Sequence, residues 1–483
     1  MLGCSQLPSC TTLLGRREVC PPSRECGTRE ERLLAAEVRW RLTGLPAGEL
    51  CGNGGLQAAE DGGMLEGSTN RRGLGMGTDY DVIVVGARCG GSPTAMLLAR
   101  GGYRVLLVDK ATFPSDTMST HFVHPPGVAA LARWGILERL EATNCPPVSR
   151  YSFDFGPVTI SGTPRPADGA ASAYGPRRIV LDALLVEAAV GAGAELREAF
   201  TVEEILVEDG RVAGIRGHAQ DGATVTERAR VVIGADGKHS LVAKAVQAER
   251  YSEAPPLAPS YYTYWSGLPT DTFETYVRAE DDRGWGVLPT HDDLTCVVMG
   301  WPLAQFEANR KDVEGTYMKS FELAPEFAER ISGAKREARF QGIRDLPGYF
   351  RKPYGPGWAL VGDAGYHKHP LTAYGITDAF RDAETLAAAL DDAFAGRNEY
   401  EEAMARYQRT RDEQSQPIYQ LTCEFAKLEP PPPEMQQLFG ALQGNQPAMD
   451  DFVSVMAGTL PVPEFFGPEN IGRIMAQAAA LAG

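Results

Sequence analysis

Two glycine-rich turns, each accompanied by an acidic residue, are the segments of this sequence best suited to hold a ligand. In the first, Gly86 and Gly91 follow an apolar run, and Asp109 ends the next apolar run along the chain. Glycines in such a turn let a pyrophosphate approach the N–H groups at a helix start, and an acidic residue about 20 positions later accepts hydrogen bonds from ribose hydroxyls. The first turn therefore predicts a strand-helix-strand unit that binds the adenosine diphosphate half of a dinucleotide.

The second turn contains Gly362 and Asp363 and also follows a short apolar strand. A loop with Pro370 then leads to Gly375, where an amphipathic pattern predicts the start of a helix. An aspartate fixed at a strand end can accept hydrogen bonds from a sugar-alcohol chain, and a helix N-terminus stabilises negative charge on a reduced ring system. The ribityl chain and the pyrimidine end of a flavin need these two features, so the two turns together predict one bound FAD.

A third turn, with Asp236 and Gly237, lies between these two in residues 229–246, which again predict a strand, a turn and a helix. The three ordered motifs resemble those of the single-component flavoprotein hydroxylases typified by p-hydroxybenzoate hydroxylase, and of their geranylgeranyl-reductase-like relatives, over residues 79–395. The resemblance implies that the Asp-Gly turn serves both FAD and a nicotinamide donor, NADH or NADPH. It implies the following FAD-binding residues: Gly86, Arg88, Gly91, Asp109, Lys110, Arg178, Asp236, Gly237, Gly362, Asp363, Pro370 and Gly375.

Several residues depart from the pattern of that family. Arg88 stands where the fingerprint has its second glycine, and its guanidinium either reaches the phosphates or lies on the surface beside a slightly relaxed turn. Ala243 replaces an arginine of the Asp-Gly motif, Tyr366 replaces a histidine of the Gly-Asp motif, and His369 replaces the first proline of its loop. Arg178 matches the FAD-contacting arginine of the family better than the arginine before it.

No catalytic base can be assigned from residue spacing. Histidines near the expected flavin are the candidates, because an imidazole titrates close to neutral pH. His369, in the loop expected beside the isoalloxazine ring, is the first candidate, followed by His121 and His124, and by His367. The alternative is that these rings form hydrogen bonds to the flavin or to the main chain.

The resemblance also implies a reaction. NAD(P)H would reduce the FAD, and oxygen would then give a flavin hydroperoxide that hydroxylates or epoxidises an apolar or aromatic small molecule. Because the chain has one dinucleotide fingerprint, the nicotinamide would dock transiently in a shared cleft. Two alternatives remain: an FAD-dependent reductase of the geranylgeranyl type and a non-catalytic flavin-binding sensor. Halogenases share the fold, but residues 283–290 do not match their W-x-W-x-I-P motif.

The composition excludes several classes of function. A net charge of −16 and the absence of a basic run argue against binding to nucleic acid or anionic lipid. No apolar run approaches the roughly 18 to 20 residues needed to span a bilayer, and the N-terminus lacks an apolar signal core, so a cytoplasmic enzyme is expected. Nine cysteines without close pairing or a C-x-x-C motif argue against a disulfide framework and against a metal site. The sequence does not indicate the oligomeric state or the substrate's identity.

The patterns together predict a protein of mixed class, α/β in its parallel part and α+β where an antiparallel sheet is inserted. It has a Rossmann-like FAD-binding domain, an inserted antiparallel-sheet substrate domain and a C-terminal helical extension. Residues 1–76 have the composition of a disordered segment, and because Met76 closely precedes the first strand, they are either an over-long reading frame or a regulatory tail. The expected bounds are 77–149, 174–246 and 342–395 for the FAD-binding domain, 150–173 and 247–341 for the substrate domain, and 396–483 for the helical region.

Aromatic residues on the strands of the expected substrate domain are candidates for the pocket wall. One face of an antiparallel sheet would look toward the active site, and the other would pack against the protein interior. An ordinary core position is the alternative for each ring. The candidates are Tyr262, Tyr264, Tyr276 and Trp285.

Overall fold

The computed structural model describes residues 79–482. The expectations of disorder, an over-long reading frame or a regulatory tail for residues 1–76 lie outside the described residues. Within the described part of the chain, no helix is long and apolar enough to cross a membrane. The same residues contain no group of three or more histidine, cysteine or carboxylate side chains that could hold a metal ion.

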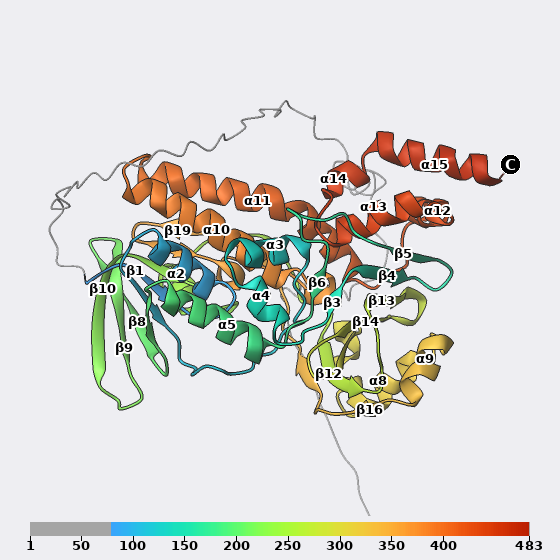
Figure 1. Ribbon diagram of the computed structural model, residues 1–483, viewed down its shortest axis with the longest axis horizontal. Coiled ribbons are helices and arrows are strands. Elements are labelled where there is room, and N and C mark those ends of the chain that lie inside the picture. Colours follow the sequence, from blue (N-terminus) through green and yellow to red (C-terminus); the bar gives the residue numbers. More distant parts are fainter. Residues whose placement is uncertain (1–78, 483) are drawn as a thin grey trace, which may run out of the picture. The chain divides into compact units, whose positions relative to one another are not determined.

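A β-sheet with a parallel centre carries the three turns (Figure 1). Strand β1, Tyr80–Val85, lies between β2, Val105–Val108, and β10, Thr224–Gly234, and pairs with both in parallel. All four residues of β2 are buried, as expected for a strand covered on both faces. Three short strands extend the sheet at its edges: β20 (Trp358–Leu360), β19 (Tyr354–Gly355) and β7 (Glu195–Arg197).

Helices cover one face of this sheet. Helix α2, Gly91–Arg100, contacts both α5, Arg178–Gly191, and α10, Gly375–Phe394, and their apolar residues share a core with β1. The long helix α11, Tyr400–Phe425, packs along α10. The opposite face packs against a hairpin and a short helix: β8 (Thr201–Glu208), β9 (Arg211–His218) and α6 (Leu241–Ala245). Two other short helices, α3 (Pro125–Arg133) and α4 (Leu137–Glu141), join the core on the side of α2 and α10. The short helix α7, Phe306–Asn309, lies against a second sheet, because the Phe306 ring stacks on Tyr261.

A second large sheet has the order β16-β12-β15-β14-β13-β4-β5, with β17 also paired to β12. Its pairs are antiparallel except β13 with β4, which is parallel because β4 enters from an earlier excursion of the chain and not from a hairpin. The strands are β4 (Arg150–Asp154), β5 (Thr159–Gly162), β12 (Ser260–Ser266), β13 (Thr272–Arg278), β14 (Arg283–Pro289), β15 (Thr295–Gly300), β16 (Lys335–Arg336) and β17 (Gln341–Ile343).

Helices also pack on both faces of the second sheet. Helices α8, Val313–Phe321, and α9, Pro325–Ser332, bury tryptophan and phenylalanine side chains against one face. The other face meets a C-terminal group of helices, which Figure 1 draws in red: α12 (Pro433–Leu442), α13 (Gln446–Met456), α14 (Val462–Phe465) and α15 (Pro468–Ala482). The predicted architecture of a Rossmann-like unit, an inserted sheet and a helical extension is therefore confirmed.

A small third sheet joins the two large ones along the chain. Its central strand β18, Gly348–Arg351, pairs with β11, Arg250–Ala254, and with β21, Tyr366–His367. β18 follows β17 of the second sheet by a few residues, and β21 directly follows the Gly-Asp turn. Two further short strands, which pair with each other, are β3 (Pro147–Val148) and β6 (Ala173–Tyr174).

Candidate active site

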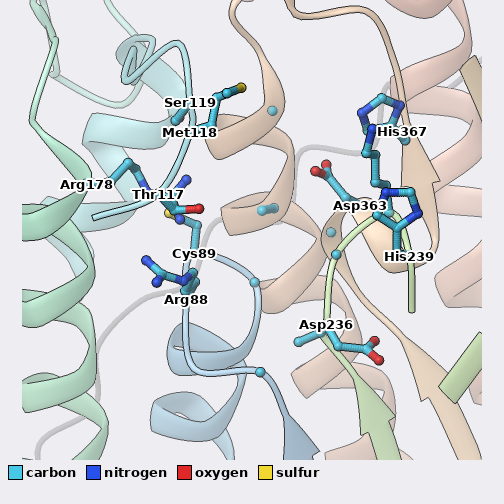
Figure 2. A pocket seen from close by; sticks show the side chains of 18 of the residues that line it. Arg88, Cys89, Thr117, Met118, Ser119, Arg178, Asp236, His239, Asp363 and His367 are labelled. Atoms are coloured by element: carbon cyan, nitrogen blue, oxygen red, sulfur yellow. The ribbon is translucent and has the colours of Figure 1, made fainter. Parts of the chain in front are cut away.

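The three predicted turns meet at one cavity of about 770 Å³. Each turn lies at the carboxyl end of a parallel strand, β1, β10 or β20, where ligands bind in open α/β sheets. Figure 2 shows Arg88, Asp236 and Asp363 around this space. The volume lies within the roughly 300–1,000 Å³ typical of small-molecule and cofactor sites. All twelve residues expected to bind FAD line this cavity except Gly91, which lies just behind the first turn.

The first turn is sterically restricted to glycine. Gly86 has φ of +105°, in the left-handed region, and a Cβ on it would lie 2.5 Å from Ala235 O. A Cβ on Gly91 would lie 1.7 Å from Gly86 O, so the turn can close on the start of α2 only without side chains there. Asp109 braces the turn, because Oδ2 accepts a hydrogen bond from Ala87 N at 2.7 Å. No acidic residue lies in the first turn of α2, which leaves this helix start suited to an anion.

Arg88 does not extend freely into the cavity but forms an ion pair with Asp182. Its Nη1 lies 2.5 Å from Asp182 Oδ2, and its Nη2 donates to Ser115 Oγ at 3.1 Å. Arg178 donates to both carboxylate oxygens of Asp182, each at 3.0 Å. Two guanidinium groups thus share one fully buried carboxylate, and the net positive charge beside the cavity suits a pyrophosphate. Sequence analysis missed Asp182, although its spacing four residues after Arg178 on one helix face was a usable signal.

The Asp-Gly turn presents an unsatisfied carboxylate oxygen. Asp236 Oδ2 accepts from Leu241 N at 2.6 Å at the start of α6, whereas Oδ1 is buried and has no partner within the described residues. Burial raises the pKa of Asp236 above its usual range, although the hydrogen bonds it accepts act in the opposite direction. A buried oxygen of this kind needs a donor, and a hydroxyl of a bound cofactor would supply one.

The Gly-Asp turn directs a second carboxylate, that of Asp363, into the cavity (Figure 2). Gly362 has φ of +59°, which favours glycine and turns the chain sharply after β20. The side chain of Asp363 is exposed to the cavity, and within residues 79–480 it has no hydrogen-bond or ion-pair partner. The residues present therefore fit the predicted cofactor, because two acceptors and a positive cluster face one cavity.

A buried ion pair lies beneath the loop that leads to α10. Lys368 Nζ contacts Asp378 in the first turn of α10 and donates to the Tyr366 hydroxyl at 2.9 Å. Burial lowers the pKa of Lys368, while the charge of Asp378 opposes this shift. Lys368 also lines the cavity beside Pro370 and Gly375. Sequence analysis missed this cation, because burial of a lysine has no local pattern.

Two of the four candidate histidines line the cavity. His369 Nε2 donates to Ala258 O at 3.1 Å and its Nδ1 accepts from Leu371 N at 3.3 Å, so main-chain groups occupy both ring nitrogens. Burial lowers the pKa of His369 to about 4. His367 Nδ1 donates to Pro347 O at 2.5 Å, which leaves Nε2 without a partner among the described side chains and main-chain atoms.

His121 and His124 are fully buried and lie outside the cavity lining. His124 Nε2 donates to Thr372 O at 3.0 Å, and His121 Nε2 lies 2.6 Å from the Tyr264 hydroxyl. Burial lowers the pKa of His121 to about 3 and that of His124 to about 4, so both rings are neutral near neutral pH. A part for either ring, or for His369, in proton transfer remains a prediction.

The wall of the cavity opposite the turns comes from the second sheet and the segment after β17. Of the four expected aromatic rings, Tyr262 lines the cavity, and Tyr264 lies on the same face of β12 behind it. The expectation was wrong for Tyr276 and Trp285, which are cross-strand partners stacked 4.9 Å apart on the opposite face, against α9. The wall otherwise consists of small and apolar side chains: Ser260, Val298, Ile343 and Leu346.

Comparisons with known proteins identify the family of this chain. Residues 79–422 match the family described as FAD binding domain. Phenazine 1,6-dicarboxylic acid hydroxylase of Lysobacter antibioticus is 28% identical over 411 residues, covering 77% of this chain and 98% of the relative. Digeranylgeranylglycerophospholipid reductase 2 of Methanopyrus kandleri is 28% identical over 318 residues, covering 62% of this chain and 73% of the relative.

A solved structure shows the same fold. The myxobacterial chondrochloren halogenase has a TM-score of 0.67 and 22% identity, with 83% of this chain and 96% of the halogenase covered. The predicted resemblance to flavoprotein hydroxylases and geranylgeranyl-reductase-like flavoproteins is confirmed at the level of the superfamily. Because the family match spans most of the chain and includes all three turns, this protein belongs to the FAD-binding domain family of oxidoreductases.

Proposed function

We propose that this protein is an NAD(P)H-dependent monooxygenase that transfers one atom of dioxygen to an apolar or aromatic small molecule. The observation that carries the proposal is the continuity of one cavity, from the three turns to an apolar wall on the second sheet. Bound FAD would supply the electron transfer and the activation of oxygen. The relative covered almost completely by this chain is named a hydroxylase of an aromatic acid, which supports the same reaction class.

The residues that line the cavity have four roles in this proposal. Asp236 and Asp363 would accept hydrogen bonds from cofactor hydroxyls, and the Arg88 and Arg178 pair would lie nearest the phosphates. The apolar wall would orient the substrate and exclude water from the reacting atoms. Of the four candidate histidines, His367 is the one that lines the cavity with an open ring nitrogen, so it is the best placed of the four to exchange a proton with a bound ligand.

An FAD-dependent reductase of the geranylgeranyl type is the second candidate. The reductase of Methanopyrus kandleri matches this chain at the same identity as the hydroxylase, although over fewer residues. An apolar wall would also accept an isoprenoid chain. A non-catalytic flavin sensor would bind FAD but show no ligand-stimulated oxidation of NAD(P)H.

The test separates reduction of the flavin from its reaction with oxygen. The FAD-loaded protein is mixed anaerobically with NADH or NADPH, with and without a panel of phenols, phenazine carboxylates and an isoprenoid lipid, and flavin absorbance is followed. Oxygen is then admitted and products are analysed. We expect an aromatic compound to accelerate reduction and to be hydroxylated only after oxygen enters. Formation of a saturated product without oxygen would contradict the monooxygenase and support the reductase.

A further inference from the structure

Two side chains of strand β18 connect the Asp-Gly turn to the Gly-Asp turn. The Tyr349 hydroxyl lies 2.8 Å from Asp363 O and 3.1 Å from Lys238 O. Arg351 Nη1 donates to Ala364 O at 2.5 Å, and its Nη2 donates to Lys238 O at 3.3 Å. Both side chains therefore contact main-chain carbonyls of the two turns at once. Neither Tyr349 nor Arg351 lines the cavity.

The side chains of β18 supply donors to the carbonyls at these turns. A buried carbonyl must be paired, and the residues that follow β10 and β20 have left the hydrogen-bond ladder of the sheet. Arg351 supplies a third contact through its own main chain, because its N–H donates to Gly365 O at 2.8 Å. Tyr349 has a single hydroxyl proton, so it donates a hydrogen bond to only one of its two carbonyls at a time. The guanidinium of Arg351 donates to two carbonyls simultaneously.

The burial of Arg351 is unusual for a residue without a carboxylate partner. The residue is 4% exposed, and within residues 79–480 its guanidinium forms no ion pair. Its side-chain hydrogen bonds go to the two turns. A second buried arginine supports it from α11, because Arg411 Nη2 donates to Arg351 O at 3.0 Å and Nη1 donates to Gly365 O at 3.3 Å. Burying a charge is costly, and here the buried guanidinium holds main-chain carbonyls of both turns in place.

We propose that Tyr349 and Arg351 are positioning residues that fix the separation of the Asp-Gly and Gly-Asp turns, and through it set the affinity for FAD without touching the cofactor. The proposal rests on the FAD-binding roles proposed for Asp236 and Asp363. A single long ligand engages both turns together, so it binds best when their separation is set before it arrives. Loss of either side chain lets the turns move apart and requires FAD to reorder them.

The experiment titrates FAD into the apoprotein of the wild type, Tyr349→Phe, Arg351→Lys and Arg351→Met. Tyr349→Phe should raise the Kd for FAD roughly threefold to tenfold, and Arg351→Met by tenfold or more, from the ordinary strengths of neutral and charged hydrogen bonds. Arg351→Lys should fall between them, since an ammonium keeps the charge but loses the planar fork. If Arg351→Met does not fold, the Kd values of Tyr349→Phe and Arg351→Lys for FAD test the proposal.

Tyr317→Phe is the matched control. The Tyr317 hydroxyl is fully buried and donates to a main-chain carbonyl, Val297 O, at 2.5 Å, but it joins helix α8 to strand β15 of the second sheet and does not line the cavity. The control should lose similar apoprotein stability and keep the wild-type Kd for FAD. ADP, which engages only the first turn, should bind Tyr349→Phe and Arg351→Lys as it binds the wild type.

Two results would overturn the proposal. One is a Kd for FAD in Tyr349→Phe and Arg351→Lys equal to that of Tyr317→Phe. The other is a fall in ADP affinity parallel to the fall in FAD affinity, which would show general damage to the fold. The readout is binding and not turnover, so failure of the monooxygenase proposal, which is seen in the products, is distinguished from failure of this one.

Discussion

Replacement of Asp363 by alanine should weaken FAD binding without weakening the apoprotein. The carboxylate faces the cavity and has no partner among the described residues, so its removal breaks no contact of the ligand-free fold. A hydrogen bond to a charged group contributes about 1.5–3 kcal/mol, which corresponds to roughly a 10- to 150-fold rise in Kd. Asp363→Asn should lose less, because an amide oxygen still accepts a hydrogen bond.

The assay is a fluorescence titration of apoprotein with FAD, run beside urea unfolding of the same apoprotein. Asp271→Ala is the control, because this exposed aspartate lies in the loop before β13 and does not line the cavity. We expect a raised Kd and an unchanged free energy of unfolding for Asp363→Ala. An unchanged Kd would show that the Gly-Asp turn does not hold the ribityl chain, and a large loss of stability would show that Asp363 has a structural partner.

Two further predictions concern stability of the apoprotein. Asp182→Ala leaves Arg88 and Arg178 without their shared carboxylate and should lower the free energy of unfolding by about 3 kcal/mol in urea titrations; a change under about 0.5 kcal/mol would contradict the shared-carboxylate interpretation. Burial lowers the pKa of His124 to about 4 in the folded protein, whereas its pKa in the unfolded chain is near 6.5. As the pH falls, the unfolded chain therefore binds the proton first. The stability that is present above about pH 6.5 is lost as the pH falls toward 4. Between about pH 7 and pH 5, this one ring should lower the free energy of unfolding by about 2 kcal/mol. His124→Gln should therefore reduce the slope of the unfolding free energy against pH. An identical slope in the variant would refute the burial argument.

Local patterns were sufficient to predict the three turns. Gly86 and Gly362 need positive φ at strand ends, and this requirement is visible in the sequence as glycine after an apolar run. Asp236 and Asp363 could be predicted as ligand-binding residues in the same way, because each stands beside a glycine at the end of an apolar run. The fold class could also be predicted, because the segments around the three turns alternate strands and helices, which requires a layered sheet.

Contacts between distant segments could not be predicted in this way. The connection of Tyr349 and Arg351 to Lys238 and Asp363 depends on β18 lying between two turns that are far apart in sequence. The histidines show the same limit: His121 and His124 were chosen for their nearness to an expected flavin, but their burial is set by packing against the second sheet. Tyr276 was placed on the wrong face, because one-residue alternation along a strand does not reveal which face is the cavity wall.

The most direct test of the central claim is mass spectrometry of the product formed under isotopically labelled dioxygen. The FAD-loaded protein is supplied with NAD(P)H and the aromatic compound that most accelerates flavin reduction, in unlabelled water. The account predicts a product that carries one labelled oxygen atom, in an amount limited by the oxygen consumed. A product without label, or one with two added hydrogen atoms that forms equally well without oxygen, would contradict it.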